Sequence, residues 1–420
     1  MTNAAVTWGI AGMATAGVIL RPARLPEAIW AVAGAVALVV FGLIPLGAAW
    51  KGIAKGADVY LFLTGMMLLA EVARREGLFD WLAGRATAFA GSSPTKLFAL
   101  VYAVGIVVTA LLSNDATAVV LTPAVLAAAA AAEVEDALPY AYVCAFIANA
   151  ASFLLPISNP ANLVVFGGGH MPPLGAWIAR FLAPSVASIA VTFLALYATQ
   201  RRALKADRIA GQAKIGRLGY GGRLAAAGIL ATAALLVAAS ALGFDLGLPT
   251  AIAGAATAFG ALLAKREAPW ALLTGISWGV LPLVAGLFVL VEALDHTGAV
   301  AALAGELRRL ADGAPRFAGW VAGLVVALAC NLTNNLPAGL IAGATVQGAQ
   351  APPDVASAVL IGVDLGPNLS VTGSLATILW LYALRREAMK VDALQFLKVG
   401  ALVTAPALIA ALAAALLTRP

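Results

Sequence analysis

Long apolar stretches alternate with short polar turns along the whole chain. A helix needs about 20 residues to cross the roughly 30 Å hydrocarbon core of a bilayer, and most of these stretches approach that length. They stay apolar throughout and are rich in Ala and Leu, whereas the strands of a membrane β-barrel alternate apolar and polar residues. The pattern therefore predicts membrane helices at 5–20, 26–46, 57–73, 97–132, 139–166, 174–199, 223–243, 248–264, 271–294, 316–349, 355–384 and 394–417.

Three of these stretches are too long for a single crossing: 97–132, 316–349 and 355–384. The first two are interrupted by LLSNDATAVVLTP and CNLTNNLPAGL. A break in mid-membrane exposes backbone groups, which is tolerated only where they line a cavity or find side-chain partners. We therefore expect two re-entrant helical hairpins, with Asn114 and Asp115 at the tip of the first and Asn334 and Asn335 at the tip of the second.

Two further segments, LLPISNPANLVVFGGG (154–169) and GVDLGPNLSVTGSLATILW (362–380), place proline, glycine and polar residues inside apolar surroundings. Proline removes an amide hydrogen and glycine permits tight turns. These segments therefore predict unwound helix midpoints. Their polar side chains would face the gap: Ser158, Asn159, Asn162, Asp364, Asn368, Ser370 and Thr372.

An internal repeat organises the chain. TGMMLLAEVARREG (64–77) matches AGLFVLVEALDHTG (285–298), and the Asn114-Asp115 pair falls on Asn334-Asn335. We also match Pro160, Asn162 and Gly167 with Pro367, Asn368 and Gly373. The predicted division is a first repeat at 1–199, a linker at 200–222 and a second repeat at 223–420. Two repeats that each cross an odd number of times are inverted in the membrane, as in many secondary transporters.

Composition and charge support this fold class. The chain is 62% hydrophobic and 11% charged, against about 45–50% and about 25% in soluble domains. Much of the net charge of +6 lies in the 200–222 linker, which the positive-inside rule places in the cytoplasm and which gives no reason to expect nucleic-acid binding. We therefore expect an all-α, multi-pass protein of the inner membrane with about ten spans. The acidic turns at Glu133, Glu135, Asp136 and Asp245 would lie outside, and Lys51 and Lys55 do not fit the pattern.

The polar residues predict a mostly neutral site that suits a small uncharged solute, because amides and hydroxyls both donate and accept hydrogen bonds. The candidate substrate-binding residues are Asn114, Thr117, Ser158, Asn159, Asn162, Thr333, Asn334, Asn335, Asn368 and Thr372. Acids in mid-membrane are costly, and we assign proton coupling to Asp115 and Asp364. The chain has no GK[ST] phosphate loop, and two cysteines with two histidines do not predict a metal site or a cofactor.

Together the segments SNDATAVVLTP, ISNPANLVV, TNNLP and DLGPNLSVTGSLATILW resemble the ArsB arsenite efflux permeases of the ion transporter superfamily. The resemblance covers nearly the whole chain. It implies export of arsenite and antimonite by proton antiport, in some members with a separate arsenite-stimulated ATPase subunit. Arsenite near neutral pH is the uncharged triol As(OH)3, in agreement with the neutral site.

Other interpretations of the same residues stay open. A sodium-proton or anion carrier of the same superfamily would use the Asn-rich tips, and a passive channel or a non-transporting scaffold would need no proton coupling. Asp115 could accept the free amides of its hairpin without a transport role. Glu71 and Glu292 recur in the repeat beside charged neighbours, which favours a solvated interfacial position over proton transport.

Overall fold

The described part of the chain, residues 3–166, 171–209 and 216–417 of a computed structural model, consists of helices joined by turns and contains no strand. The first half contains α1 (Asn3–Leu20), α2 (Glu27–Val40), α3 (Leu46–Lys55), α4 (Ala57–Arg75), α5 (Leu78–Ala90), α6 (Pro94–Leu111), α7 (Asn114–Ala116), α8 (Thr122–Ala131), α9 (Leu138–Ala150), α10 (Pro160–Phe166) and α11 (Leu174–Ala206). The second half contains α12 (Tyr220–Ala241), α13 (Gly247–Lys265), α14 (Trp270–Gly275), α15 (Val280–His296), α16 (Ala299–Gly313), α17 (Pro315–Thr333), α18 (Asn335–Ala349), α19 (Pro353–Leu365), α20 (Leu375–Arg386) and α21 (Ala393–Leu417). The expected all-helical membrane fold is confirmed.

Eight helical segments in the described ranges are long and apolar enough to cross a membrane. They are α1, α6, the continuous stretch Asn114–Ala131, α11, α12, α13, α17 and α21. Counting each bent pair as one span raises the number to ten; α3 and α4 meet at 46°, and α15 and α16 meet at 73°. Three of the eight segments are arms of the two predicted hairpins, so length alone does not separate hairpin arms from full crossings.

Both hairpins lie where the sequence predicts them. The first descends through α6, breaks at Leu112 and Ser113, and returns through α7 and α8. Between these last two helices the chain forms a π-helical turn, η2 (Thr117–Leu121), because the ring of Pro123 would clash with the carbonyl four residues earlier in a regular helix. The second hairpin consists of α17 and α18, which only Asn334 separates.

Both unwound midpoints are also present, but the matching of Pro160 with Pro367 is wrong in register. Pro160 begins α10, whereas Pro367 lies before α20 in the 3-10 turn η4 (Gly366–Leu369), and the 3-10 turn before α10 in the first half is η3 (Pro156–Ser158). Helices α9 and α19 end at Ala150 and Leu365, and α10 and α20 begin ten residues after these ends in both halves. This register pairs Asn149 with Asp364. The match of Pro160 with Pro367 was wrong because similar clusters of Pro and Asn occupy different turns in the two halves.

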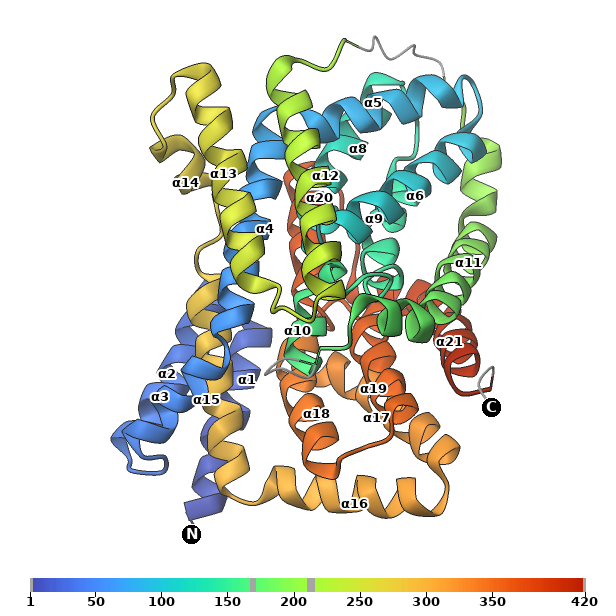
Figure 1. The fold of residues 1–420 in the computed structure, drawn as a ribbon. Helices are drawn as coiled ribbons and strands as arrows, with labels where there is room; N and C mark the ends of the chain where they lie inside the picture. Colours follow the sequence, from blue (N-terminus) through green and yellow to red (C-terminus); the bar gives the residue numbers. More distant parts are fainter. Residues whose placement is uncertain (1–2, 167–170, 210–215, 418–420) are drawn as a thin grey trace.

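Elements follow in the same order in both halves, from α4 to α11 and from α15 to α21. In Figure 1, α5 lies across the top of the molecule and α16 lies across the bottom, as expected for two oppositely oriented copies. The halves interlock, because α4 packs along α13 and α15 packs along α2. The repeated glycines make these crossings close: a Cβ on Gly65 would overlap the Thr250 carbonyl, and one on Gly286 would overlap Ala31.

The predicted linker contains helical ends, since α11 continues to Ala206 and α12 begins at Tyr220. Asp207 accepts a hydrogen bond from the backbone N–H of Glu135 at 3.0 Å. The acidic turn at Glu133, Glu135 and Asp136 therefore lies on the linker's side of the protein, and its assignment to the opposite side is wrong. The reason is the first hairpin, which enters and leaves on one side; acidic residues are in any case weak topology markers.

Candidate functional site

The tip of the first hairpin is built from three consecutive polar residues. Ser113 adopts an extended conformation and its hydroxyl oxygen accepts the N–H of Ala116 at 3.1 Å. Asn114 is buried, and its side-chain oxygen accepts the N–H of Asp115 at 2.9 Å. These side chains satisfy amides that a helix leaves unpaired at its start. The carboxyl group of Asp115 has no hydrogen-bond partner among the described residues.

The tip of the second hairpin repeats this division of roles. Asn334 has a φ of 74° and a ψ of 154°, a backbone conformation that Asn tolerates better than most residues. Its side-chain oxygen accepts the N–H of Leu336 at 3.3 Å. The backbone N–H of Asn335 donates to Gly373 at 2.9 Å, whereas the Asn335 side chain makes no hydrogen bond with a described residue. At each tip, an asparagine, Asn114 or Asn334, accepts a backbone N–H through its side-chain oxygen, and the side chain of the residue that follows has no hydrogen bond with a described residue.

The two unwound midpoints cross each other, and polar side chains join them. Asn159 donates from Nδ2 to Oδ1 of Asp364 at 2.9 Å, and Ser152 lies 2.7 Å from Oδ2 of the same carboxyl. Asn149 donates to the side-chain oxygen of Asn368 at 2.8 Å. All five side chains are fully buried or nearly so. This polar crossing links the first half of the chain to the second.

Two other predicted residues, Ser158 and Asn334, hold each hairpin to the unwound segment of its own half, and the remaining ones bond within their own segment. Ser158 donates to the carbonyl of Ala110 at 3.1 Å, and the amide of Asn334 donates to the carbonyl of Thr372 at 3.4 Å. Asn162 donates to carbonyls of the 152–156 turn. The hydroxyls of Thr117 and Thr333 bond to Thr109 and to their own helix. No hydrogen bond joins the two tips directly in the described ranges.

Sequence reasoning missed three residues of this network: Asn149, Ser152 and Asn331. Asn331 donates to the carbonyls of Ala327 and Gly366 and accepts from the hydroxyl of Ser370 at 2.8 Å. It therefore fastens α17 to the second unwound segment. Asn331 stands inside the CNLTNN motif and could have been found there. Asn149 and Ser152 precede their motif and carry no comparable signal.

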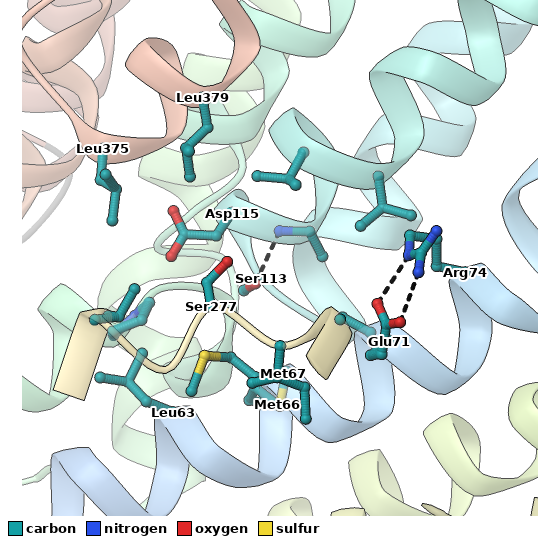
Figure 2. A pocket seen from close by; sticks show the side chains of 18 residues that line it. Leu63, Met66, Met67, Glu71, Arg74, Ser113, Asp115, Ser277, Leu375 and Leu379 are labelled. Carbon is teal, nitrogen blue, oxygen red and sulfur yellow. Dashed lines mark hydrogen bonds and ion pairs between the residues drawn. The ribbon is translucent and has the colours of Figure 1, made fainter. Parts of the chain in front are cut away.

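A cavity of about 140 Å³ lies between the first hairpin tip and α4. Figure 2 shows the Asp115 carboxyl group pointing into it, between Leu375 and Leu379 of α20 and Ser277 of the 276–279 turn. One water needs roughly 10–15 Å³ of such space, so the cavity admits a small solute. Asp115 is the one predicted site residue that lines it, and none of the ten predicted substrate-binding residues is part of the lining in this conformation.

The cavity wall also carries an ion pair. Arg74 donates from Nε and Nη2 to both carboxylate oxygens of Glu71, at 2.8 Å and 2.6 Å (Figure 2). Arg74 is the one cationic side chain among the described residues that line the cavity. Because this fork-to-fork geometry neutralises the guanidinium, the cavity offers no free positive charge.

A second cavity, of about 360 Å³, lies near the opposite end of α4 and contains the other repeated glutamate. Lys55 pairs with Glu292 at 2.6 Å there. Glu71 and Glu292 are only 6% and 8% exposed, so the expectation of solvated interfacial acids is wrong. Each carboxylate is buried because a cation from its own or a neighbouring helix compensates the charge. His170 and the 167–169 glycine run lie outside the described residues.

The hairpin tips, the crossing of unwound helices and the cavities beside them define a membrane transporter. The sequence profile of the CitMHS family, described as citrate transporter, matches residues 15–367, which is most of the chain. The chain belongs to this family.

Curated relatives have more specific names. The chain is 29% identical over 390 residues to an arsenical pump membrane protein of Yersinia enterocolitica, covering 89% of this chain and 90% of that protein. It is 28% identical over 414 residues to the arsenical pump membrane protein of Escherichia coli K12, covering 94% and 95%. The expected resemblance to the arsenical pump proteins is thereby confirmed.

One solved structure has a related fold. The YdaH transporter of Alcanivorax borkumensis superposes with a TM-score of 0.54 at 14% identity, covering 86% of this chain and 85% of that one. That transporter is described as having an unusual topology. At this level of identity the likeness concerns the fold, and it agrees with the helical transporter architecture.

Proposed function

We propose that the protein exports arsenite and antimonite from the cell as As(OH)3 and Sb(OH)3 in exchange for protons. The observation that carries this proposal is the charge of the cavity: one unpartnered acid, Asp115, beside a cation that Glu71 already neutralises. Such a cavity accepts a small neutral guest with several hydroxyl groups. The names of the arsenical pump relatives supply the same class of substrate.

The family description, citrate transporter, suggests a competing substrate. Citrate carries several negative charges at neutral pH, and a protein site for it needs free cationic or strongly donating groups. The guanidinium of Arg74 already donates two hydrogen bonds to the carboxylate of Glu71. The carboxyl group of Asp115, which points into the cavity, would repel an anion. The cavity therefore favours a neutral triol over a tricarboxylate.

Protons drive the export in this proposal, with Asp115 and Asp364 as the groups that carry them. Exchanging one inward proton for one outward neutral solute moves one net charge, which gains about 2.3 kcal/mol per 100 mV of membrane potential. A pH difference adds about 1.36 kcal/mol per unit. The two inverted repeats expose the site alternately to either side. The 200–222 linker faces the cytoplasm, where it would also meet an ATPase subunit.

The test is arsenite uptake into everted inner-membrane vesicles, with and without a proton gradient. We expect gradient-dependent uptake by the wild type and, in Asp115→Asn, uptake no higher than in vesicles without the protein, because the cavity loses its proton-accepting group. Asp312→Asn is the matched control, since Asp312 is exposed on α16 far from the cavity lining. Antimonite should compete with arsenite.

Three results would contradict the proposal. Undiminished gradient-driven uptake by Asp115→Asn would remove the proton role of this acid. Sodium-dependent transport that ignores arsenite would favour a sodium-coupled carrier. Arsenite flux that does not respond to the proton gradient would favour a passive channel.

A further inference from the structure

Ser152 lies in the unwound stretch between α9 and α10 and is fully buried. Its hydroxyl oxygen is 2.8 Å from the backbone carbonyl oxygen of Asn149 and 2.7 Å from Oδ2 of Asp364. Both distances are those of good hydrogen bonds. A serine hydroxyl has a single hydrogen, so it can donate to only one of these two oxygens. The carbonyl oxygen can only accept, and the second contact therefore needs a hydrogen from Asp364.

The other carboxyl oxygen of Asp364, Oδ1, accepts a hydrogen bond from Asn159. The side-chain oxygen of Asn159 accepts the N–H of Ala161 at 3.0 Å, which fixes the orientation of the amide. Its Nδ2 must then donate to Oδ1 of Asp364, at 2.9 Å. Oδ1 is therefore an acceptor, and Oδ2, facing Ser152, is the position at which a proton completes the network.

Within the described ranges, no cation compensates a negative charge on Asp364. Among the described residues, no lysine or arginine forms an ion pair with Asp364, and its neighbours Val363 and Leu365 on α19 are apolar and fully buried. The titratable group that faces it is the Cys330 thiol of α17, which is directed at the carbonyl of Val363. The other helices packed on α19, namely α9, α10, α11, α18 and α21, bring no charged side chain to the carboxyl. A buried carboxylate without a partner is strongly disfavoured.

We propose that Asp364 is a neutral carboxylic acid in this conformation. Ser152 is the positioning residue whose hydrogen bonds connect the protonation state of Asp364 to α9. The acid donates from Oδ2 to the Ser152 hydroxyl, and Ser152 donates to the carbonyl of Asn149. When the proton leaves Oδ2 for water that enters an opened site, the Ser152 hydroxyl turns to the carboxylate and releases that carbonyl. One O–H bond breaks, and the proton passes to water.

The released carbonyl belongs to a residue that holds the crossing together. The side chain of Asn149 donates to Asn368 of η4, and Asn368 donates back to the carbonyl of Phe146 in α9. The side-chain oxygen of Asn149 is buried and has no hydrogen-bond partner among the described residues, and its backbone carbonyl also accepts the N–H of Ser152 at 3.4 Å, a longer bond than the one from the Ser152 hydroxyl. The proton on Asp364 thus decides how firmly the two unwound midpoints are joined. This role in coupling rests on the proposed proton antiport, whereas the neutral state of the acid does not.

The experiment is infrared difference spectroscopy of the full chain in liposomes at neutral pH, with no arsenite and no gradient. A protonated carboxylic acid has a carbonyl-stretch band that is separate from the carboxylate bands. We expect Asp364→Asn to lose one such acid band relative to the wild type. Ser152→Ala should keep the band but shift it to higher frequency, because the acid loses its acceptor, and Ser152→Thr should restore the wild-type position.

Ser188→Ala is the matched control. Ser188 is equally buried and donates to the carbonyl of Ala150 at 2.9 Å, next to the residue that Ser152 bonds, but it contacts no acid. We expect it to leave the acid band unchanged. A shift of equal size in Ser188→Ala would overturn the specific role of Ser152.

Loss of a carboxylate band instead of an acid band in Asp364→Asn would overturn the neutral state. Where that variant fails to fold, the comparison of Ser152→Ala with Ser152→Thr decides, and an unshifted band in both overturns the proposal. Because the spectra need no substrate, failure of arsenite transport leaves this result intact, and a carboxylate at Asp364 leaves arsenite transport through Asp115 intact.

Discussion

Gly286→Ala tests the close crossing of α15 and α2, because a side chain at this position would overlap Ala31 of α2. The new Cβ would lie 2.7 Å from the carbonyl carbon of Ala31 and 2.9 Å from its Cβ. Reaching the 3.4 Å of ordinary contact requires the helices to separate by roughly 0.7 Å. Overpacking of this kind costs about 1–3 kcal/mol, whereas Ala in place of Gly within a helix gains about 0.5–1 kcal/mol.

The expected net effect is a loss of about 1–2 kcal/mol in the free energy of unfolding. The measurement is the thermal unfolding midpoint of the purified full chain in detergent, followed by tryptophan fluorescence. One kcal/mol moves the midpoint by about 2–4 °C in domains of 150–250 residues and by less in longer chains. Gly12→Ala is the control, because Gly12 is exposed on α1 and has nothing within 4 Å of an added Cβ. A Gly286→Ala midpoint at or above that of Gly12→Ala would refute the interlocked packing of the two halves.

Two further predictions concern the cavity and the tips. Glu71→Gln frees the guanidinium of Arg74, so citrate should inhibit arsenite uptake at least tenfold more strongly than in the wild type. A tenfold change in affinity corresponds to about 1.4 kcal/mol. A charge pair near 4 Å is worth about 4 kcal/mol at an effective dielectric of 20, which is more than enough. Glu306→Gln, which breaks a similar i,i+3 pair on exposed α16, should leave citrate without effect. Asn335→Ala should raise the apparent KM for arsenite without changing the proton dependence, because it removes the available amide of the second tip; an unchanged KM in vesicle uptake would count against that tip as a binding element.

The breaks in the helices could be predicted from the sequence because their chemistry is local. Asn114 and Asn334 lie in apolar stretches too long for one crossing, and their side-chain oxygens accept N–H groups at the start of the returning helices, as the cost of unpaired backbone groups requires. The repeat likewise identified Gly65 and Gly286, whose lack of a side chain serves the same kind of helix crossing in both halves.

Contacts between distant segments could not be predicted in the same way. Asn149 and Ser152 gain their importance from Asn368 and Asp364, which lie more than 200 positions away along the chain, and no motif beside Asn149 or Ser152 predicts these contacts. Glu71 and Glu292 were expected in solvent because charged residues flank them, but each is buried beside a cation: Glu71 pairs with its neighbour Arg74, and Glu292 pairs with Lys55 of α3, which is distant in the sequence. Whether a charged side chain is buried depends on the position of its ion-pair partner in the folded protein, which cannot be predicted from the neighbouring residues in the sequence.

The adjacent placement of a capping residue and an available one at each hairpin tip has a consequence for how such a carrier can diversify. In the proposed transport site, substitution at Asp115 or Asn335 would change the groups offered to a guest, while Asn114 and Asn334 would continue to secure the turn. A lineage can therefore exchange its cargo one position at a time without rebuilding the scaffold, and a protein engineer could do the same.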